Sequence, residues 1–418
     1  MSLTAISRYG ARVLENTEDI AAGCKARGEF IQGPQIAQFE AAFAARHGYQ
    51  PGHAIAASYG RMAFYYILQA LQLPPGSEII MPALTFWVMP ELARVAGLTV
   101  VFADIDPATF TIDPSAIERA ITPQTRAVVP THLYGLPCDM DAIAAIAEKH
   151  NLKVVEDCAH ALGATFGGRP VGTFGEAAIF SFQTLKPLNC YGGGLALVRD
   201  TPLAERVRAL VERGPWPDRK RIENRLLVGR LQRIFIKPWV FTISAFPILW
   251  VSSLIGANPD VYLWEQIRSL TPLPDSYLER FPNVQAAIGL EALKHLDEWT
   301  DLTRRHARVM DRALADLPGI SVPVVPPKRT HVYYQYCVHG PKRDELVVRC
   351  VRRGIDIETL HVDVCSDMEL FAGARAEPEG TPGARTAAGA MQLPVYSSLT
   401  DAQVARVARV VRGVLAGA

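Results

Sequence analysis

The two residues of this chain that could do covalent chemistry together are an acid and an amine, Asp157 and Lys186. Asp157 ends the short run 154–157, and Lys186 follows the apolar run 177–182. We expect both runs to be buried strands, and in open α/β sheets functional groups gather beyond the carboxyl ends of such strands. One sheet edge would then present both side chains. There a lysine can hold the aldehyde of pyridoxal 5'-phosphate as a Schiff base, while the acid keeps the pyridine nitrogen protonated.

A second group of residues could bind an anion. Tyr59, Gly60 and Arg61 precede an apolar stretch that is predicted to be helical through Leu71. A glycine turn that opens a helix offers free backbone N–H groups and a positive dipole end, which suit a phosphate. Arg61 could add its charged fork to the cofactor phosphate, or it could serve as a surface or subunit-contact arginine.

The surrounding pattern predicts an α/β protein. From residue 74 to 129, short apolar runs alternate with helical stretches, which is typical of βα units and a largely parallel sheet. The segment 372–390, rich in Gly, Pro, Arg and Ala, is expected to be a flexible loop. Apolar periodicity predicts helices at 35–46, 140–150, 284–314, 342–353 and 401–415, and a strand within 332–339.

Several motifs, in order along the chain, resemble the DegT/StrS-type family of pyridoxal phosphate aminotransferases. They are FIQGPQIAQFEAAFA, LPPGSEIIMPALTF, EDCAHALGA, VGTFGEAAIFSF followed by a lysine, and MQLPVYSSLT. The resemblance implies a fold-type-I aminotransferase: a large three-layer domain with a mainly parallel sheet (1–204) and a smaller C-terminal α+β domain. The latter, with its linking helix, would occupy 276–418. Residues 205–275 fall outside the resemblance and are expected to form a basic and apolar insertion.

The resemblance also implies roles for single residues. Lys186 matches the Schiff-base lysine, and Ser181, five residues before it, matches a phosphate-binding serine. Phe86 stands where the family places an aromatic ring against the cofactor face. His160 stands three residues after Asp157, where the family most often has Gln, and either side chain can donate a hydrogen bond to the cofactor's phenolic oxygen.

Further positions depart from the family pattern. The usual Gly-Glu-Gly-Gly is Tyr191-Gly192-Gly193-Gly194 here, Pro187 replaces a common asparagine, and Leu278 replaces an asparagine that reaches the neighbouring subunit's cofactor. These departures concern contacts to the substrate and between subunits. They leave Lys186 and Asp157 in place.

Bulk composition excludes several other classes. Net charge is +1, which does not indicate nucleic-acid binding. The seven cysteines include no CxxC pair, which argues against a zinc site and a disulfide framework, so we expect no metal. The N-terminus lacks an apolar signal core, and a cytoplasmic protein is expected. His132 follows a predicted strand, where it could face the site or be a satisfied structural histidine.

The insertion carries an interpretation of its own. Residues 219–237 hold seven basic residues and one acid, and residues 238–259 are uncharged with two tryptophans and a break expected at Pro247. This pattern is typical of a segment that lies on the inner face of a membrane, which predicts contact through 219–259. The alternative is burial against the enzyme body or a second subunit.

Together these features predict an aminotransferase that moves an amino group from an amino acid to a carbonyl acceptor. By family habit the donor is glutamate, the acceptor a nucleotide-linked keto-sugar, and the enzyme a homodimer. One alternative is a lipid-linked or aliphatic carbonyl acceptor at the membrane surface. Another is a non-catalytic regulatory or binding protein on the same fold, against which the intact Asp157, Ser181 and Lys186 argue.

Overall fold

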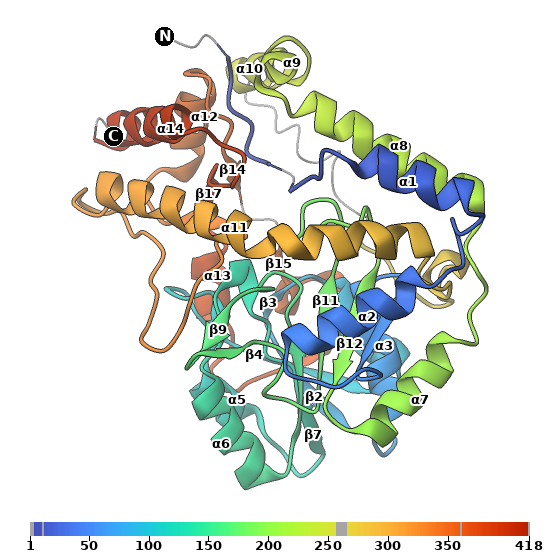
Figure 1. The fold of residues 1–418 in the computed structure, drawn as a ribbon. Helices are drawn as coiled ribbons and strands as arrows, with labels where there is room; N and C mark the ends of the chain where they lie inside the picture. The colour runs from blue at the N-terminus through green and yellow to red at the C-terminus, as the bar shows by residue number, and fades with distance from the viewer. Residues whose placement is uncertain (1–3, 11, 256–265, 360–361, 417–418) are drawn as a thin grey trace.

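A central eight-stranded sheet organises the protein, whose computed structural model describes residues 4–10, 12–255, 266–359 and 362–416 (Figure 1). Among the described strands of this sheet, β12 runs antiparallel to both of its neighbours and the others are parallel to one another. The predicted mainly parallel α/β sheet is therefore confirmed. In sheet order the strands are β1 (Ala54–Ala57), β12 (Gly194–Val198), β11 (Ala177–Ser181), β8 (Lys153–Asp157), β7 (Thr125–Val128), β2 (Glu78–Pro82), β4 (Thr99–Ala103) and β16 (Arg375–Ala376).

Helices cover both faces of this sheet because its strands are apolar on both sides. In β8, Val155 packs toward one face with Ile179 of β11, and Val154 packs toward the other. Such near-continuous apolar runs are expected of buried parallel strands. The first face is covered by α3 (Gly60–Leu71), α4 (Val88–Val95) and α7 (Thr201–Val211), and the second by α2 (Gln35–Arg46), α5 (Pro114–Ala120), α6 (Met140–His150) and α11 (Asn283–Leu314).

The long helix α11 joins the large sheet to a smaller α+β unit. Its first half packs on α2, and its last turns pack on the C-terminal helix α14 (Asp401–Leu415). The small unit has a three-stranded antiparallel sheet in the order β13-β17-β14. Its elements are β13 (Tyr336–Val338), α12 (Arg343–Val351), β14 (Glu358–Thr359), β17 (Met391–Leu393) and α14 (Asp401–Leu415).

The segment 372–390, which was expected to be a flexible loop, is ordered structure. It contributes β16 to the edge of the large sheet and forms α13 (Pro382–Ala387). Arg375 donates to Glu78 at 3.0 Å, and the backbone N–H groups of Gly383 and Ala384 donate to Asp104 at 2.7 and 2.8 Å. The local composition misled the prediction because these partners are distant in sequence.

The described part of the stretch 219–259 forms three consecutive helices, α8 (Arg219–Phe235), α9 (Pro238–Ile243) and α10 (Ala245–Ile255). Its last residues, 256–259, lie outside the described residues. The chain breaks at Ser244, which has φ −108° and ψ −80°, and not at Pro247 as expected. Pro247 lies in the first turn of α10, where its missing N–H costs no helical hydrogen bond. Within the described part of the chain, no helix is long and apolar enough to cross a membrane.

Candidate active site

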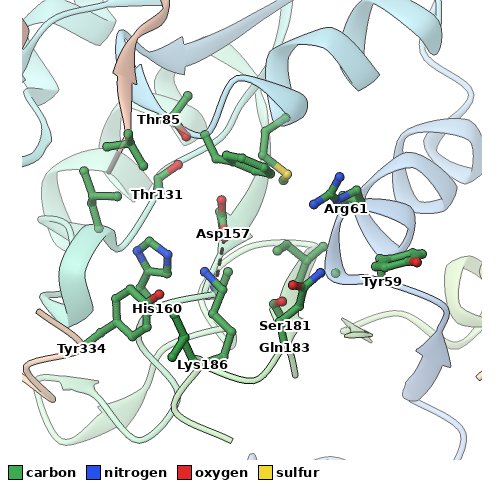
Figure 2. A pocket seen from close by; sticks show the side chains of 18 of the residues that line it. Tyr59, Arg61, Thr85, Thr131, Asp157, His160, Ser181, Gln183, Lys186 and Tyr334 are labelled. Atoms are coloured by element: carbon green, nitrogen blue, oxygen red, sulfur yellow. Dashed lines mark hydrogen bonds between the residues drawn. The ribbon is translucent and has the colours of Figure 1, made fainter. Parts of the chain in front are cut away.

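A pocket of about 290 Å³ lies at the carboxyl edge of the large sheet (Figure 2). The ends of β8 and β11 and the start of α3 form its floor, and residues before β13 and in β14 reach it from the small unit. All seven residues predicted for the site line this pocket. They are Gly60, Arg61, Phe86, Asp157, His160, Ser181 and Lys186.

Lys186 and Asp157 point toward each other within the pocket (Figure 2). Burial lowers the pKa of Lys186 to about 8; the charge of Asp157 opposes this shift and that of Arg61 adds to it. Burial raises the pKa of Asp157, although the N–H of Ala159 and the charge of Lys186 oppose that change. The pair thus combines an amine that loses its proton easily with an acid whose charged form is stabilised by a cationic partner.

The start of α3 forms a narrow cradle beside Ser181. A Cβ on Gly60 would lie 2.8 Å from the carbonyl oxygen of Phe180, and one on Gly194 would lie 2.0 Å from the Gly60 nitrogen. Only glycine therefore fits at both positions, which accounts for part of the glycine cluster after Lys186. The first N–H groups of α3 have no partner inside the helix, so this cradle suits an anion.

Arg61 lies at the rim of the cradle among aromatic rings. Its guanidinium is 5.1 Å from the ring centre of Phe86, 5.6 Å from that of Tyr59 and 5.3 Å from that of Tyr277. It also donates to Tyr277 Oη at 2.5 Å. These contacts hold the arginine at the pocket and place a positive charge where a phosphate would bind.

His160 stacks on Tyr334, with ring centres 4.1 Å apart and planes 21° apart. Its Nδ1 accepts from the backbone N–H of Tyr134 at 3.4 Å. In the neutral ring, the other nitrogen, Nε2, then carries the proton and can act as a donor.

The residues present fit pyridoxal phosphate. The hydroxyls of Thr85 and Thr131 are buried at the pocket wall and have no hydrogen-bond partner among the residues that the structure describes. Buried hydroxyls are normally paired, so two orphans beside one cavity indicate a polar ligand. Thr131, three residues after the end of β7, forms an isolated β-bridge with Asp157. These hydroxyls and the glycine cradle would supply polar contacts to a phosphorylated ring bound in the pocket.

Sequence reasoning missed the part of the pocket that comes from remote segments. Tyr9, Tyr334 and Glu358 line it, and Tyr9 Oη donates to the Glu358 carboxylate. The ring of Tyr334 is in contact with Lys186, and the distance from Lys186 Nζ to the ring centre is 4.9 Å. None of the three stands near a recognisable motif, so the sequence carried no local signal for them.

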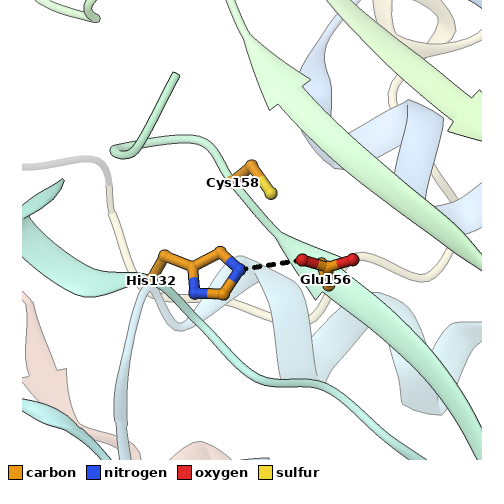
Figure 3. A group of neighbouring side chains, drawn as sticks. All are labelled: His132, Glu156 and Cys158. Atoms are coloured by element: carbon orange, nitrogen blue, oxygen red, sulfur yellow. Dashed lines mark hydrogen bonds and ion pairs between the residues drawn. The ribbon is translucent and has the colours of Figure 1, made fainter. Parts of the chain in front are cut away.

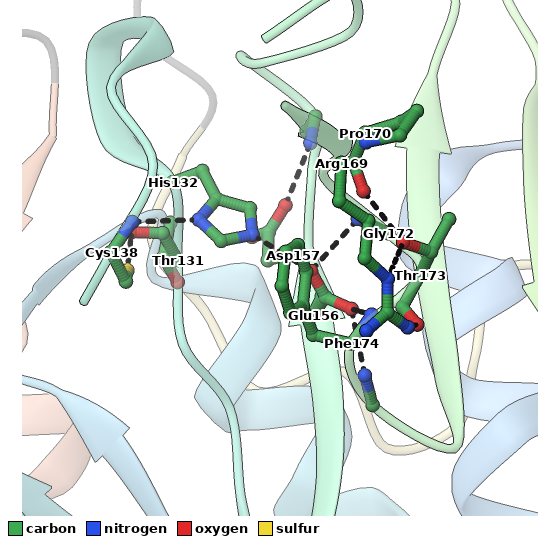
Figure 4. A network of polar contacts seen from close by, with 12 residues as sticks. Thr131, His132, Cys138, Glu156, Asp157, Arg169, Pro170, Gly172, Thr173 and Phe174 are labelled. Carbon is green, nitrogen blue, oxygen red and sulfur yellow. Dashed lines mark hydrogen bonds and ion pairs between the residues drawn. The ribbon is translucent and has the colours of Figure 1, made fainter. Parts of the chain in front are cut away.

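A buried group beside the site, formed by His132, Glu156 and Cys158, has metal-ligating side chains within 4.8 Å of one another (Figure 3). The carboxylate oxygens of Glu156 already accept four hydrogen bonds. Glu156 accepts from His132 at 3.1 Å and from the backbone N–H groups of Gly172, Phe174 and Gly175 (Figure 4).

The imidazole of His132 is also fully used, because its Nδ1 accepts from the Cys138 N–H at 3.0 Å. Burial alone would raise the pKa of Glu156, but the hydrogen bonds from His132 and the backbone hold that pKa below its usual range. His132 is therefore a satisfied structural histidine, one of the two possibilities left open by the sequence.

The comparison with known families identifies the family to which this fold belongs. The model of the DegT/DnrJ/EryC1/StrS aminotransferase family matches residues 14–234 and 265–412. The chain belongs to this family. Its members are aminotransferases, a class that is generally dependent on pyridoxal phosphate. The unmatched stretch, 235–264, is shorter than the 205–275 expected, so α7 and most of α8 belong to the family pattern.

Individual relatives match along most of the chain. A protein named pleiotropic regulatory protein from Geobacillus stearothermophilus is 34% identical over 384 residues, covering 90% of this chain and 87% of the relative. A dTDP-3-amino-3,4,6-trideoxy-alpha-D-glucose transaminase from Streptomyces venezuelae is 33% identical over 388 residues, with 92% and 88% covered. The crystal structure of S. venezuelae DesV in complex with a ketimine intermediate matches with a TM-score of 0.75 at 30% identity, covering 95% and 94%.

Proposed function

We propose that this protein is a pyridoxal phosphate-dependent aminotransferase that transfers an amino group from an amino acid, by family habit glutamate, to a nucleotide-linked keto-sugar. The observation that carries the proposal is the pocket at the sheet edge, which brings Lys186, Asp157 and the Gly60 cradle together. Family membership supports the reaction class. The Streptomyces relative, whose name describes a dTDP-sugar transaminase, supports the acceptor class.

When bound, the cofactor supplies an electrophilic carbon and a ring that accepts electrons. Lys186 would hold it through Nζ, and Asp157 would keep a negative charge beside the pyridine nitrogen. The cradle at Gly60 and Ser181, together with Arg61, would bind the phosphate. Lys186 Nζ, once free, would take the proton from Cα of the donor and return one to the acceptor carbon. A lysine can act as a base only when neutral, and its lowered pKa favours that form.

The test is the Lys186→Ala variant of the purified protein. The wild type reconstituted with pyridoxal phosphate should be yellow, and borohydride should fix the cofactor on Lys186, as read by peptide mass spectrometry. The variant should lose the fixed cofactor and multiple turnover together. Normal multiple turnover by Lys186→Ala would overturn the assignment.

The same experiment separates the enzyme from a regulatory protein. The relative named as a pleiotropic regulatory protein makes this alternative worth testing. A binding module needs no amine of lowered pKa facing a buried acid, and this pair favours catalysis. Fixed cofactor on Lys186 without amino transfer to any keto-sugar nucleotide or lipid-linked carbonyl would favour regulation.

A second candidate acceptor is a lipid-linked carbonyl at the membrane surface, and an exposed apolar face on α9 and α10 favours it. Trp239, Ile243 and Ile248 are 62, 71 and 65% exposed. We define the helical arm as residues 219–255, and we infer that it contacts the inner face of the membrane.

The homodimer implied by the family resemblance is also part of the proposal, and light scattering of the purified protein tests it.

A further inference from the structure

A smaller cavity shares a wall with the candidate active site. It has a volume of about 40 Å³, and Tyr9, Leu185, Tyr334 and Glu358 line both spaces. That volume has room for about three water-sized groups. Because the ring of Tyr334 lies 4.9 Å from Lys186 Nζ, the small cavity begins one ring away from the reacting amine.

On the side of the small unit, two polar residues of the sheet β13-β17-β14 line the cavity, Glu358 and Gln392, together with Gln335, Leu393, Val395 and Tyr396. Gln392 of β17 is paired with Glu358 of β14 and with Cys337 of β13. Directly paired residues on neighbouring strands point to the same face of a sheet. Gln392 and Glu358 therefore stand side by side, and both line the cavity.

Among the described residues, Gln392 has no partner for either end of its amide. Its side chain is buried, with 4% of the residue exposed, yet neither Nε2 nor Oε1 makes a hydrogen bond to that part of the chain. A buried amide in this state is costly, and native proteins keep such groups unpaired where a ligand or water completes them. Gln392 lines the small cavity, so its unpaired amide belongs to the wall of a space beside the reaction centre.

Its neighbour Glu358 is fixed in place. It accepts from Tyr9 Oη and lies 3.8 Å from Arg8 Nη1, and Arg8 is itself tied to Asp356 at 2.7 Å. Burial, together with the charge of Glu358, raises the pKa of Tyr9, so the phenol keeps its proton for Glu358. The carboxylate is therefore held as an acceptor at the wall between the two spaces.

We propose that Gln392 and Glu358 form a subsite for one hydroxyl group of the sugar acceptor. A hydroxyl both donates and accepts, so it could donate to the Glu358 carboxylate or Gln392 Oε1 and accept from Gln392 Nε2. Such a site favours a keto-sugar that retains this hydroxyl over its deoxygenated analogue, because the analogue leaves buried groups unpaired. The inference rests on the proposed function and specifies the substrate class of the same pocket.

The test measures binding and not turnover. Calorimetry would compare dTDP-glucose with the set of its singly deoxygenated analogues, using the cofactor-loaded wild type, Gln392→Leu and Gln69→Leu. The last variant makes the same change on the exposed side of α3. One analogue should bind the wild type and Gln69→Leu at least about tenfold more weakly than dTDP-glucose. In Gln392→Leu this difference should disappear, while thermal stability is kept or raised.

Two results distinguish a failure of the subsite proposal from a failure of the proposed function. If the wild type binds dTDP-glucose and every analogue equally well, or if Gln392→Leu keeps the full discrimination, the subsite is wrong and the proposed function stands. If the wild type binds no nucleotide sugar at all, the proposed acceptor class fails and the subsite fails with it. A large loss of stability in Gln392→Leu would also contradict the inference, because it would reveal a structural partner for the amide.

Discussion

At the scale of single residues, two adjacent carboxylates at the end of β8 have opposite tasks. Successive residues of a strand point to opposite faces, so Asp157 faces the pocket on the α3 side while Glu156 faces the side of α5 and α6. Glu156 is saturated by four hydrogen bonds, whereas Asp157 accepts from the N–H of Ala159 and keeps capacity for a cationic partner. The strand alternation alone thus separates a structural acid from a candidate catalytic acid.

Replacing Asp157 by Asn should slow amino transfer by at least about a hundredfold, which corresponds to about 3 kcal/mol in the barrier. The amide keeps the size of the side chain but removes the charge that would stabilise a protonated pyridine nitrogen. Single-turnover kinetics with glutamate would measure the effect. Asp141→Asn, the same change on exposed α6, should leave the rate unchanged. A change of less than threefold in Asp157→Asn would remove Asp157 from its assigned role.

The rate at which the apoprotein incorporates the cofactor should rise with pH, because only neutral Lys186 Nζ attacks an aldehyde. The midpoint of this rise should lie near the lowered pKa of about 8, and the rate should level off at higher pH. The charge of Asp157 raises the pKa of Lys186, so Asp157→Asn should move the midpoint to lower pH. The charge of Arg61 lowers the pKa of Lys186, so Arg61→Gln should move the midpoint to higher pH. Stopped-flow absorbance across pH gives the three midpoints. A wild-type midpoint near the ordinary lysine value of 10.5 would contradict the burial argument.

The sequence predicted which residues of the large unit meet at the pocket, because each follows a strand or opens a helix at one sheet edge. Gly60, Asp157 and Ser181 are examples. It did not place Glu358 or Gln392 at the pocket, although Gln392 lies within the motif MQLPVYSSLT. Their position depends on how the small unit folds back over the sheet, and no local pattern encodes that packing.

At the scale of elements, the buried acid Glu156 joins β8 to the loop before β11. The N–H groups of Gly172, Phe174 and Gly175 all point at its carboxylate, at 2.8, 2.6 and 2.8 Å. Arg12 fixes the chain just after Lys186, because it donates to the carbonyl oxygen of Pro187 at 3.1 Å. These ties hold the two segments between which Asp157 and Lys186 are presented.

Replacing Glu156 by Ala should lower the free energy of unfolding by about 3–5 kcal/mol, because His132 and three backbone N–H groups would lose their acceptor. Denaturant unfolding would measure the loss. Because the pKa of Glu156 is lowered in the folded protein, its contribution is present above the ordinary pKa of a glutamic acid and is lost as pH falls through the lowered value. A chelator should not change the stability of the wild type, and a chelator-dependent loss would indicate a metal instead.

Helices with strong apolar periodicity were predicted almost to the residue, as at α2, α6 and α14. Caps explain part of this agreement, since Asp139 accepts from the Ala142 N–H and Thr400 closes a capping box with Gln403. The order in 372–390 was missed because it depends on contacts to Glu78 and Asp104, which no short window of sequence contains.

At the scale of the whole molecule, the helical arm connects the active site to an exposed apolar face. On α8, Arg225 Nη2 donates to Tyr59 Oη at 2.8 Å at the pocket, and the same helix continues to the exposed Leu231 and Phe235 (Figure 1). Residues 224–259 contain no acidic residue, while Arg230, Arg233 and Lys237 carry positive charge. An apolar face with only basic residues around it complements an anionic bilayer surface.

The arm should therefore bind vesicles that contain anionic lipid. Basic residues near such a surface contribute about 1 kcal/mol each, and burial of the apolar side chains adds to this. Because salt screens only the charges, high salt should release only part of the bound protein. Co-sedimentation would compare the wild type with a variant in which a short polar linker replaces residues 238–255, and with Trp239→Ser/Ile243→Ser/Ile248→Ser. The serine variant keeps the arm's length while removing its most exposed apolar groups. Both variants should remain in the supernatant as dimers. If the wild type also remains there and the linker variant becomes monomeric, the arm is a subunit interface and the membrane proposal is wrong.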